Sequence, residues 1–187
     1  MGEFLFKVRG YTPLPFFLIA VIFQQPQRGL INLGLVLVVW GELLRLWGIS
    51  YTGAATRTRK VGAPELVTNG PYAHLRNPLY LGNIFMYSGV VIAFGGWLPY
   101  LLYLVIFFFS WQYILIVKAE EKKLSELFGE KFKLYRESVP RFLPRLSPYP
   151  QRTQIKPNLV AALKSEKSTF MVIAGLILVF VIRASIF

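Results

Sequence analysis

The sequence predicts an all-α integral membrane protein with about five transmembrane helices. Hydrophobic residues make up 55% of the 187 residues and the mean hydropathy is +0.49, which exceeds the apolar content of an ordinary soluble domain. Residues 77–117 contain no charged side chain, and one span needs only roughly 20 apolar residues. This stretch is therefore long enough for two spans. We expect residues 1–187 to form a single membrane domain.

Five apolar segments are expected to cross the membrane, and they cover about residues 11–25, 29–50, 78–94, 97–117 and 169–187. Gly95, Gly96 and Pro99 can turn the chain between the third and fourth segments, which predicts a helical hairpin. The last segment has little spare length at about 1.5 Å per residue. It can span only if Arg183 reaches the interface.

Basic residues predict the orientation and the environment. With the N-terminus inside, Lys7, Arg9, the 51–76 loop and the 118–167 region all lie on the cytoplasmic side. We expect a prokaryotic cytoplasmic membrane. The net charge of +12 indicates contact with membrane lipids and not with nucleic acid, because the basic residues lie at the ends of apolar segments and in one polar region. Without cysteine and with one histidine, no metal site built by the protein is expected.

Two polar blocks flank the predicted hairpin. Residues 70–83 read GPYAHLRNPLYLGN, and Glu120-Glu121 follow the charge-free stretch. Each arm is about 30 Å long, so both blocks should meet at one membrane face and could hold a zwitterion between Arg76 and the carboxylates. Each residue alone also has a structural interpretation. Arg76 and the tyrosines would lie at the interface, Asn77-Pro78 would begin a helix, and the glutamates would form the solvated face of an amphipathic helix.

GPYAHLRNPLYLGN followed by AEEKKLSELFGEKFKLYRESVPRFLP resembles the isoprenylcysteine carboxyl methyltransferase and phospholipid methyltransferase family. The resemblance implies a membrane methyltransferase that binds S-adenosylmethionine on the cytoplasmic side. Its cofactor pocket would be formed by segments 66–82 and 118–145, at the ends of the hairpin. It would methylate a lipophilic acceptor, such as a prenylcysteine carboxylate, an aminophospholipid or a related lipid. No glycine-rich dinucleotide-binding fingerprint is present in the sequence.

The resemblance also implies site residues. The expected cofactor-binding residues are Tyr72, His74, Leu75, Arg76, Asn77, Pro78, Tyr80, Leu81, Glu120 and Glu121. The glutamates would meet the cofactor's ammonium and Arg76 its carboxylate. Asn77 stands where the family usually has histidine, and His74 cannot be assumed to replace it. Because asparagine cannot act as a general base, Glu121 is the nearby candidate for that role, and with Arg76 it is expected to be catalytic.

Glu42 and Arg45 are the expected acceptor-binding residues, since they lie three apart on the second span and charges inside a membrane are often functional. Arg45 would lie near an acidic head group of the acceptor. The alternative is a structural ion pair. Residues 145–167 are interpreted as a solvated connector to the last span, with binding of anionic lipid as the alternative.

Two other functions remain open. A membrane reductase of the sterol reductase type would bind a nicotinamide cofactor, but Glu120-Glu121 would repel its phosphates. A noncatalytic lipid-binding membrane protein would leave the polar residues at one face unexplained. The sequence does not identify the methyl acceptor or the oligomeric state.

Overall fold

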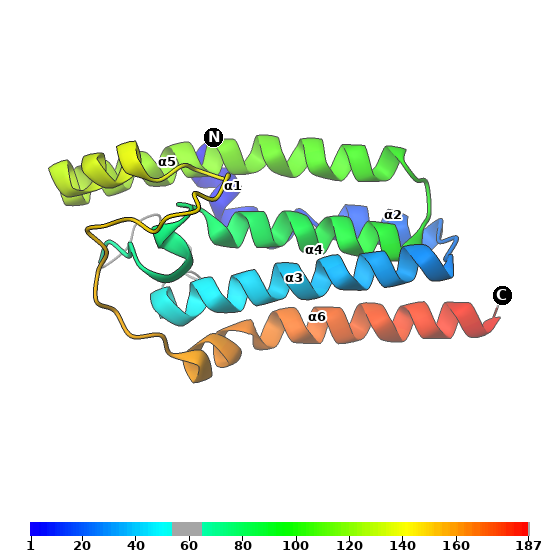
Figure 1. Ribbon diagram of the computed structural model, residues 1–187. Helices are drawn as coiled ribbons and strands as arrows, with labels where there is room; N and C mark the ends of the chain where they lie inside the picture. Colours follow the sequence, from blue (N-terminus) through cyan, green and yellow to red (C-terminus); the bar gives the residue numbers. More distant parts are fainter. Residues whose placement is uncertain (54–64, 187) are drawn as a thin grey trace.

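The computed structural model describes residues 1–53 and 65–186, and within these ranges it contains helices and no β-strand. The helices are α1 (Gly2–Val8), α2 (Leu14–Ile22), α3 (Arg28–Thr52), the short 3₁₀ helix η2 (Gly70–Ala73), α4 (Pro78–Phe94), α5 (Tyr100–Ser138) and α6 (Leu159–Ile186). The four long helices lie side by side, with α4 between α3 and α5, and α6 against α3 (Figure 1). The expected all-helical membrane fold is thus confirmed.

Three of these helices, α3, α5 and α6, are long and apolar enough to cross a membrane. The other two expected spans are shorter: α4 has 17 residues and α2 has nine, about 13 Å at 1.5 Å per residue. The count of five spans therefore stays a prediction. The last helix begins at Leu159, well before the expected residue 169, so part of the expected connector is helical. The side chain of Arg183 lies outside the described part of the chain.

The helical hairpin formed by α4 and α5 is confirmed. Helix α4 ends at Phe94, where Gly95 adopts the left-handed conformation with φ 72°, and α5 begins at Tyr100. The two helices run in opposite directions, so the start of α4 and the second half of α5 lie at the same end of the bundle (Figure 1). Helix α5 continues far beyond the apolar stretch, to Ser138, with a kink at Gly129. We call this end of the bundle the polar end.

Helices α3 and α4 pack closely because glycines face each other. A Cβ atom on Gly41 of α3 would lie 2.5 Å from the carbonyl oxygen of Gly82, and one on Gly89 of α4 would lie 2.6 Å from that of Gly34. Only glycine permits this approach of two backbones. The contact fixes how α3 lies against α4, and so which polar side chains of the two helices meet.

The segment after α5 folds back over the turn that precedes α4. The backbone N–H groups of Arg76, Arg145 and Tyr149 donate to the carbonyls of Pro140, His74 and Ala73, at 2.9, 3.0 and 2.9 Å. Beneath these bonds is a small apolar cluster, which consists of Ala73, Phe132, Tyr135, Val139 and Tyr149. The two polar blocks of the sequence are thus held together by backbone bonds as well as by side chains.

Candidate functional site

A cavity of about 790 Å³ begins at the polar end and extends between the helices. Its polar part is lined by Arg9, Tyr72, Asn77, Tyr80, Glu120 and Glu121, from the N-terminal segment, the η2–α4 region and α5. Its apolar part is lined by Phe17, Val38, Met86, Val90, Val172 and Leu176, from α2, α3, α4 and α6. Small-molecule sites commonly measure about 300–1,000 Å³. The cavity can therefore hold a polar molecule and an apolar chain next to each other.

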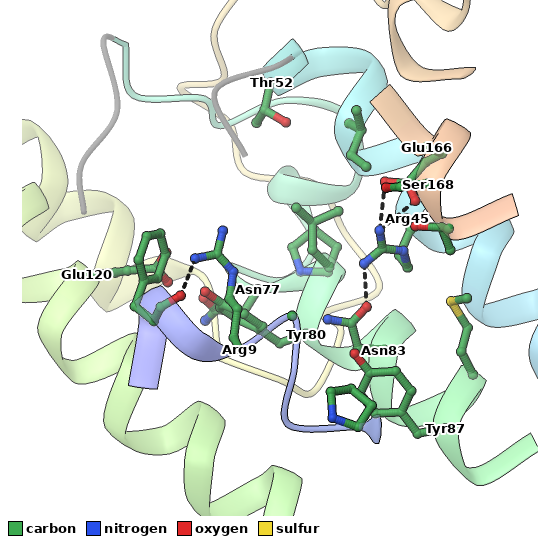
Figure 2. Close-up of a pocket in the computed structure, with 18 of the residues that line it drawn as sticks. Arg9, Arg45, Thr52, Asn77, Tyr80, Asn83, Tyr87, Glu120, Glu166 and Ser168 are labelled. Atoms are coloured by element: carbon green, nitrogen blue, oxygen red, sulfur yellow. Dashed lines mark hydrogen bonds and ion pairs between the residues drawn. The ribbon is translucent and has the colours of Figure 1, made fainter. Parts of the chain in front are cut away.

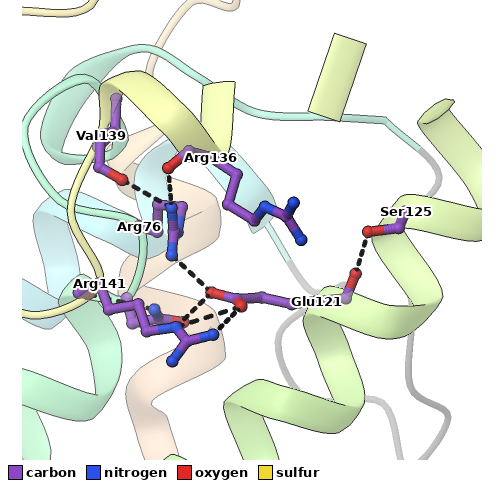
Figure 3. Close-up of polar contacts among 7 residues, drawn as sticks. Arg76, Glu121, Ser125, Arg136, Val139 and Arg141 are labelled. Carbon is purple, nitrogen blue, oxygen red and sulfur yellow. Dashed lines mark hydrogen bonds and ion pairs between the residues drawn. The ribbon is translucent and has the colours of Figure 1, made fainter. Parts of the chain in front are cut away.

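Glu121 lies between two guanidinium groups (Figure 3). Arg76 Nη2 donates to Glu121 Oε1 at 2.9 Å, and Arg141 Nη2 donates to Oε2 at 2.6 Å. Arg76 also donates to the carbonyl oxygens of Arg136 and of Val139, the latter at 2.8 Å. Burial lowers the pKa of Arg76, an effect that the charge of Glu121 opposes. These bonds clamp the start of α4 to α5 and to the segment after it.

Glu120 borders the cavity beside the clamp, beyond the apolar part of α5. Burial raises the pKa of its carboxyl group to about 7, although a hydrogen bond from Tyr80 and the positive charge of Arg9 act in the opposite direction. Figure 2 shows Arg9 and Glu120 pointing toward each other. Arg9 lies directly after α1. Its Nη1 donates to the Phe6 carbonyl at 2.6 Å, and its guanidinium lies 3.7 Å from the centre of the Phe6 ring.

Aromatic side chains complete the polar part. Tyr72, Phe132 and Tyr135 line it, and the Tyr135 hydroxyl donates to the Tyr72 carbonyl at 2.7 Å. Burial raises the pKa of the Tyr72 hydroxyl, so this group stays protonated and can donate a hydrogen bond well above neutral pH. Aromatic faces attract cations and stack on flat rings. Together with a carboxylate and a guanidinium, they suit a zwitterion that carries an aromatic ring.

The structure places the ten expected cofactor residues in two groups. Seven line the cavity, namely Tyr72, Arg76, Asn77, Pro78, Tyr80, Glu120 and Glu121. Among the described lining residues, His74, Leu75 and Leu81 are not found. Leu75 is buried, and His74 Nδ1 lies 2.9 Å from the Arg145 carbonyl oxygen. Asn77 borders the cavity while its amide donates to the Arg141 carbonyl at 3.1 Å. The predicted approach of Arg76 to Glu121 is confirmed, whereas their catalytic roles stay predictions.

A second charged cluster lies where the polar part meets the apolar part (Figure 2). Arg45 pairs with Glu42 along α3 at 3.4 Å, as in the structural alternative to acceptor binding. Glu42 is not among the described residues that line the cavity, and acceptor binding by these two residues stays a prediction. The stronger partner is Glu166 of α6, whose two oxygens accept hydrogen bonds from Arg45 Nη2 at 2.6 and 2.7 Å. Arg45 also donates to Asn83 Oδ1, and Asn83 donates to the Tyr113 hydroxyl at 3.1 Å. Arg45 lines the cavity together with Glu166 and Asn83.

Arg9, Arg141 and Glu166 were missed by sequence reasoning. Glu166 was part of a segment interpreted as a connector, but its side chain is 0% exposed. Arg9 was assigned only a side of the membrane. No pattern within its own segment points to Glu120, because the contact depends on how α1 packs against α5. For Arg141, the only signal in the sequence is the motif VPRFLP at the start of the proline-rich 140–150 segment.

Comparison with known proteins gives one family. The sequence model of the phospholipid methyltransferase family matches residues 30–131, more than half of the chain. Protein-S-isoprenylcysteine O-methyltransferase of Schizosaccharomyces pombe is 30% identical over 148 residues, which cover 76% of this chain and 60% of that protein. The corresponding enzyme of Xenopus laevis is 29% identical over 117 residues, covering 60% of this chain and 40% of that protein.

A third relative has a different kind of name. The nickel-cobalt-cadmium resistance protein NccN of Alcaligenes xylosoxydans xylosoxydans is 33% identical over 119 residues, which cover 63% of this chain and 51% of that protein. The chain thus spans 40 to 60% of the length of these three relatives. The family match runs from Leu30 in α3 through η2 and α4 to Lys131 in α5, and so it contains the Arg76–Glu121 pair. The chain belongs to the phospholipid methyltransferase family, with isoprenylcysteine O-methyltransferases among its relatives.

Proposed function

We propose that the protein is an S-adenosylmethionine-dependent methyltransferase that acts on a lipophilic acceptor. The observation that carries this proposal is a cavity whose polar part contains a carboxylate, a guanidinium and aromatic rings, and whose other part is apolar. A polar cofactor and a lipid need adjoining compartments of these two kinds. Membership of the phospholipid methyltransferase family supports the same reaction class.

The polar part fits the cofactor's chemistry. Glu120 lines it with a carboxylate that can bind an ammonium, and Tyr72 and Phe132 present rings to an adenine or a sulfonium. When bound, S-adenosylmethionine supplies a methyl group that is activated by the positive sulfur. The protein's part is then to align donor and acceptor and to exclude water. The packed segment over η2 would serve the second purpose.

The apolar part supports a lipophilic acceptor. Val90 of α4 and Val172 and Leu176 of α6 line it, within helices that have the composition of membrane spans or lie beside them. We propose that an acyl or isoprenoid chain lies here, with its polar end toward Asn77 and Glu120. Arg45 and Asn83 lie along that path and would contact the acceptor's head group.

Glu121 is less suited to the role of general base than the sequence suggested. Its oxygens already accept hydrogen bonds from Arg76 and Arg141. We propose instead that it holds the α4 turn in place, so that Asn77 and Tyr80 face the cavity. An ionised carboxylate acceptor would need no base, whereas an ammonium acceptor would first have to lose a proton.

A methyl-transfer assay tests the proposal. Membranes that contain the protein are incubated with S-adenosylmethionine labelled in its methyl group, and the lipid extract is analysed for labelled species. We expect a labelled lipid that is absent from membranes without the protein. Titration calorimetry with S-adenosylhomocysteine and with reduced nicotinamide adenine dinucleotide phosphate then separates the rivals. Binding of the nicotinamide cofactor alone would favour the reductase. Binding of neither ligand would favour a noncatalytic lipid-binding protein.

A further inference from the structure

We propose that Arg9, and not Arg76, binds the carboxylate of the cofactor's amino-acid portion while Glu120 binds its ammonium. This inference rests on the proposed function. It gives the N-terminal segment a direct part in ligand binding, although this segment lies outside the residues that match the family model.

Arg76 is already engaged by the protein. Its side chain is 9% exposed, its Nη2 donates to Glu121, and its Nη1 donates to two backbone carbonyls. To bind a carboxylate it would have to leave Glu121 or those carbonyls, and a buried polar group without its partner costs about 1–3 kcal/mol. Arg76 therefore serves better as part of the clamp than as a ligand contact.

Three other described cationic residues line the cavity: Lys7, Arg9 and Arg45. Arg45 is bound by Glu166 at the border of the apolar part. Lys7 has an exposed side chain. Arg9 is half-buried and faces Glu120 in the polar part (Figure 2). Among these cations, Arg9 combines a guanidinium group with a position in the polar part, and an amino-acid carboxylate needs both.

The charges of Arg9 and Glu120 match those of a zwitterion. An amino acid brings one ammonium and one carboxylate, so it can enter between the two side chains and give each a new partner of opposite sign. No net charge is then added at the buried Glu120, where an unpaired charge is costly. A guanidinium also suits a carboxylate because it can donate two parallel hydrogen bonds.

The position of Arg9 is set by the packing of α1. Phe6 is buried in the main apolar cluster, and Gly2 lies so close to α5 that a Cβ atom there would be 2.5 Å from the Leu115 carbonyl oxygen. The Arg9 guanidinium is oriented by the Phe6 carbonyl and ring. It is therefore held at the cavity by a helix anchored about one turn before Glu120 along α5.

A comparison of two ligands tests this assignment. One is S-adenosylhomocysteine, and the other is its analogue in which hydrogen replaces the α-carboxylate. Calorimetry measures the affinity of both for the unmodified protein, Arg9→Gln, Arg9→Lys, Arg76→Gln and the control Lys122→Gln, an exposed residue of α5 that is not among the described lining residues, with thermal melting to check folding. Arg9→Gln should weaken binding of S-adenosylhomocysteine about tenfold or more and leave the analogue within about twofold. Arg9→Lys should recover part of the loss, and Lys122→Gln should bind both ligands normally.

Three results would overturn the assignment. Equal weakening of both ligands by Arg9→Gln would mean that Arg9 only positions α1. An unchanged affinity for both would mean that it has no part in binding. If folded Arg76→Gln lost affinity only for S-adenosylhomocysteine and Arg9→Gln did not, Arg76 would be the residue that binds the carboxylate. If the unmodified protein bound neither ligand, the proposed function itself would fail, and this inference with it.

Discussion

Nη2 of Arg45 in α3 donates to both carboxylate oxygens of Glu166 in α6, at 2.6 and 2.7 Å, across 121 residues of sequence. The Glu166 side chain is fully buried, and the Arg45 side chain is 13% exposed. Helix α6 makes its main contact with α3, and only 6% of its apolar stretch is buried inside the protein. The ion pair at this contact therefore contributes much to holding α6 against α3, where α6 forms a wall of the apolar part.

Removal of one partner should be more harmful than removal of both. Arg45→Met takes the guanidinium away from the buried Glu166 carboxylate, with an expected loss of about 3–5 kcal/mol in unfolding free energy. Glu166→Met should cost less, because Arg45 keeps Glu42 and Asn83 as partners. The double variant should recover part of the loss of Arg45→Met, because apolar side chains replace the pair while the buried Glu42 still lacks the Arg45 guanidinium. Thermal melting in detergent measures the effect, with Lys164→Gln on the exposed side of α6 as the control. Additive losses would show that the pair is not coupled.

The glycine contact between α3 and α4 should tolerate no side chain. Gly41→Val would place atoms against the Gly82 carbonyl and Met86, which forces the helices apart and moves Arg45 away from Asn83. We expect a loss of at least about 2 kcal/mol, as for other overpacked contacts. Gly175→Val is the matched control in α6, since no atom lies within 4 Å of a Cβ atom built there. Equal melting temperatures of the two variants would contradict the proposed packing.

Much of the fold follows from local sequence features. Pro78, Gly95 and the charge-free stretch define α4 and the hairpin, because a proline can begin a helix and a glycine can end one. The hairpin then brings Arg76 to Glu121 at one end of the bundle. This part of the site was predictable since it needs only the direction of two consecutive helices.

The rest depends on contacts between distant segments. Glu166 pairs with Arg45 only because α6 begins ten residues earlier than its apolar pattern indicated. Arg9 reaches Glu120 only because α1 packs on α5. The sequence also does not distinguish the roles of Glu120 and Glu121, since adjacent helical residues point in different directions: Glu121 toward Arg76 and Arg141, Glu120 toward Arg9.

The topology predicts that both polar blocks face the cytoplasm. The 51–76 loop belongs to the same side, although its residues 54–64 lie outside the described ones. Because the chain contains no cysteine, single cysteines at Glu65, Ser125 and Tyr100 can be labelled with an impermeant reagent in intact cells. Tyr100, at the turn of the hairpin, should react, whereas Glu65 and Ser125 should react only after the membrane is opened. Opposite behaviour of Glu65 and Ser125 would disprove the hairpin topology.

The last prediction concerns pH, because Glu120 has a carboxyl pKa of about 7, raised by burial from an ordinary value of 4.5. The folded protein therefore holds a proton that the unfolded chain has lost between these values. Stability without ligand should fall as the pH rises from about 5 to 8. Ligand binding should show the opposite trend, since an ammonium needs the ionised carboxylate.

If only the ionised form binds, the affinity for S-adenosylhomocysteine should rise about tenfold between pH 6 and pH 8, in proportion to the ionised fraction of a group with a pKa near 7. Calorimetry at several pH values measures the affinity, and thermal melting measures stability.

Glu120→Gln should bind S-adenosylhomocysteine more weakly and with an affinity that does not change with pH, and it should melt at a higher temperature than the unmodified protein at pH 8. Glu126→Gln, whose exposed carboxylate pairs with Lys123, should keep the original profile. A rising affinity that persists in Glu120→Gln would show that another group carries the pH dependence, and the ammonium would then need a different partner.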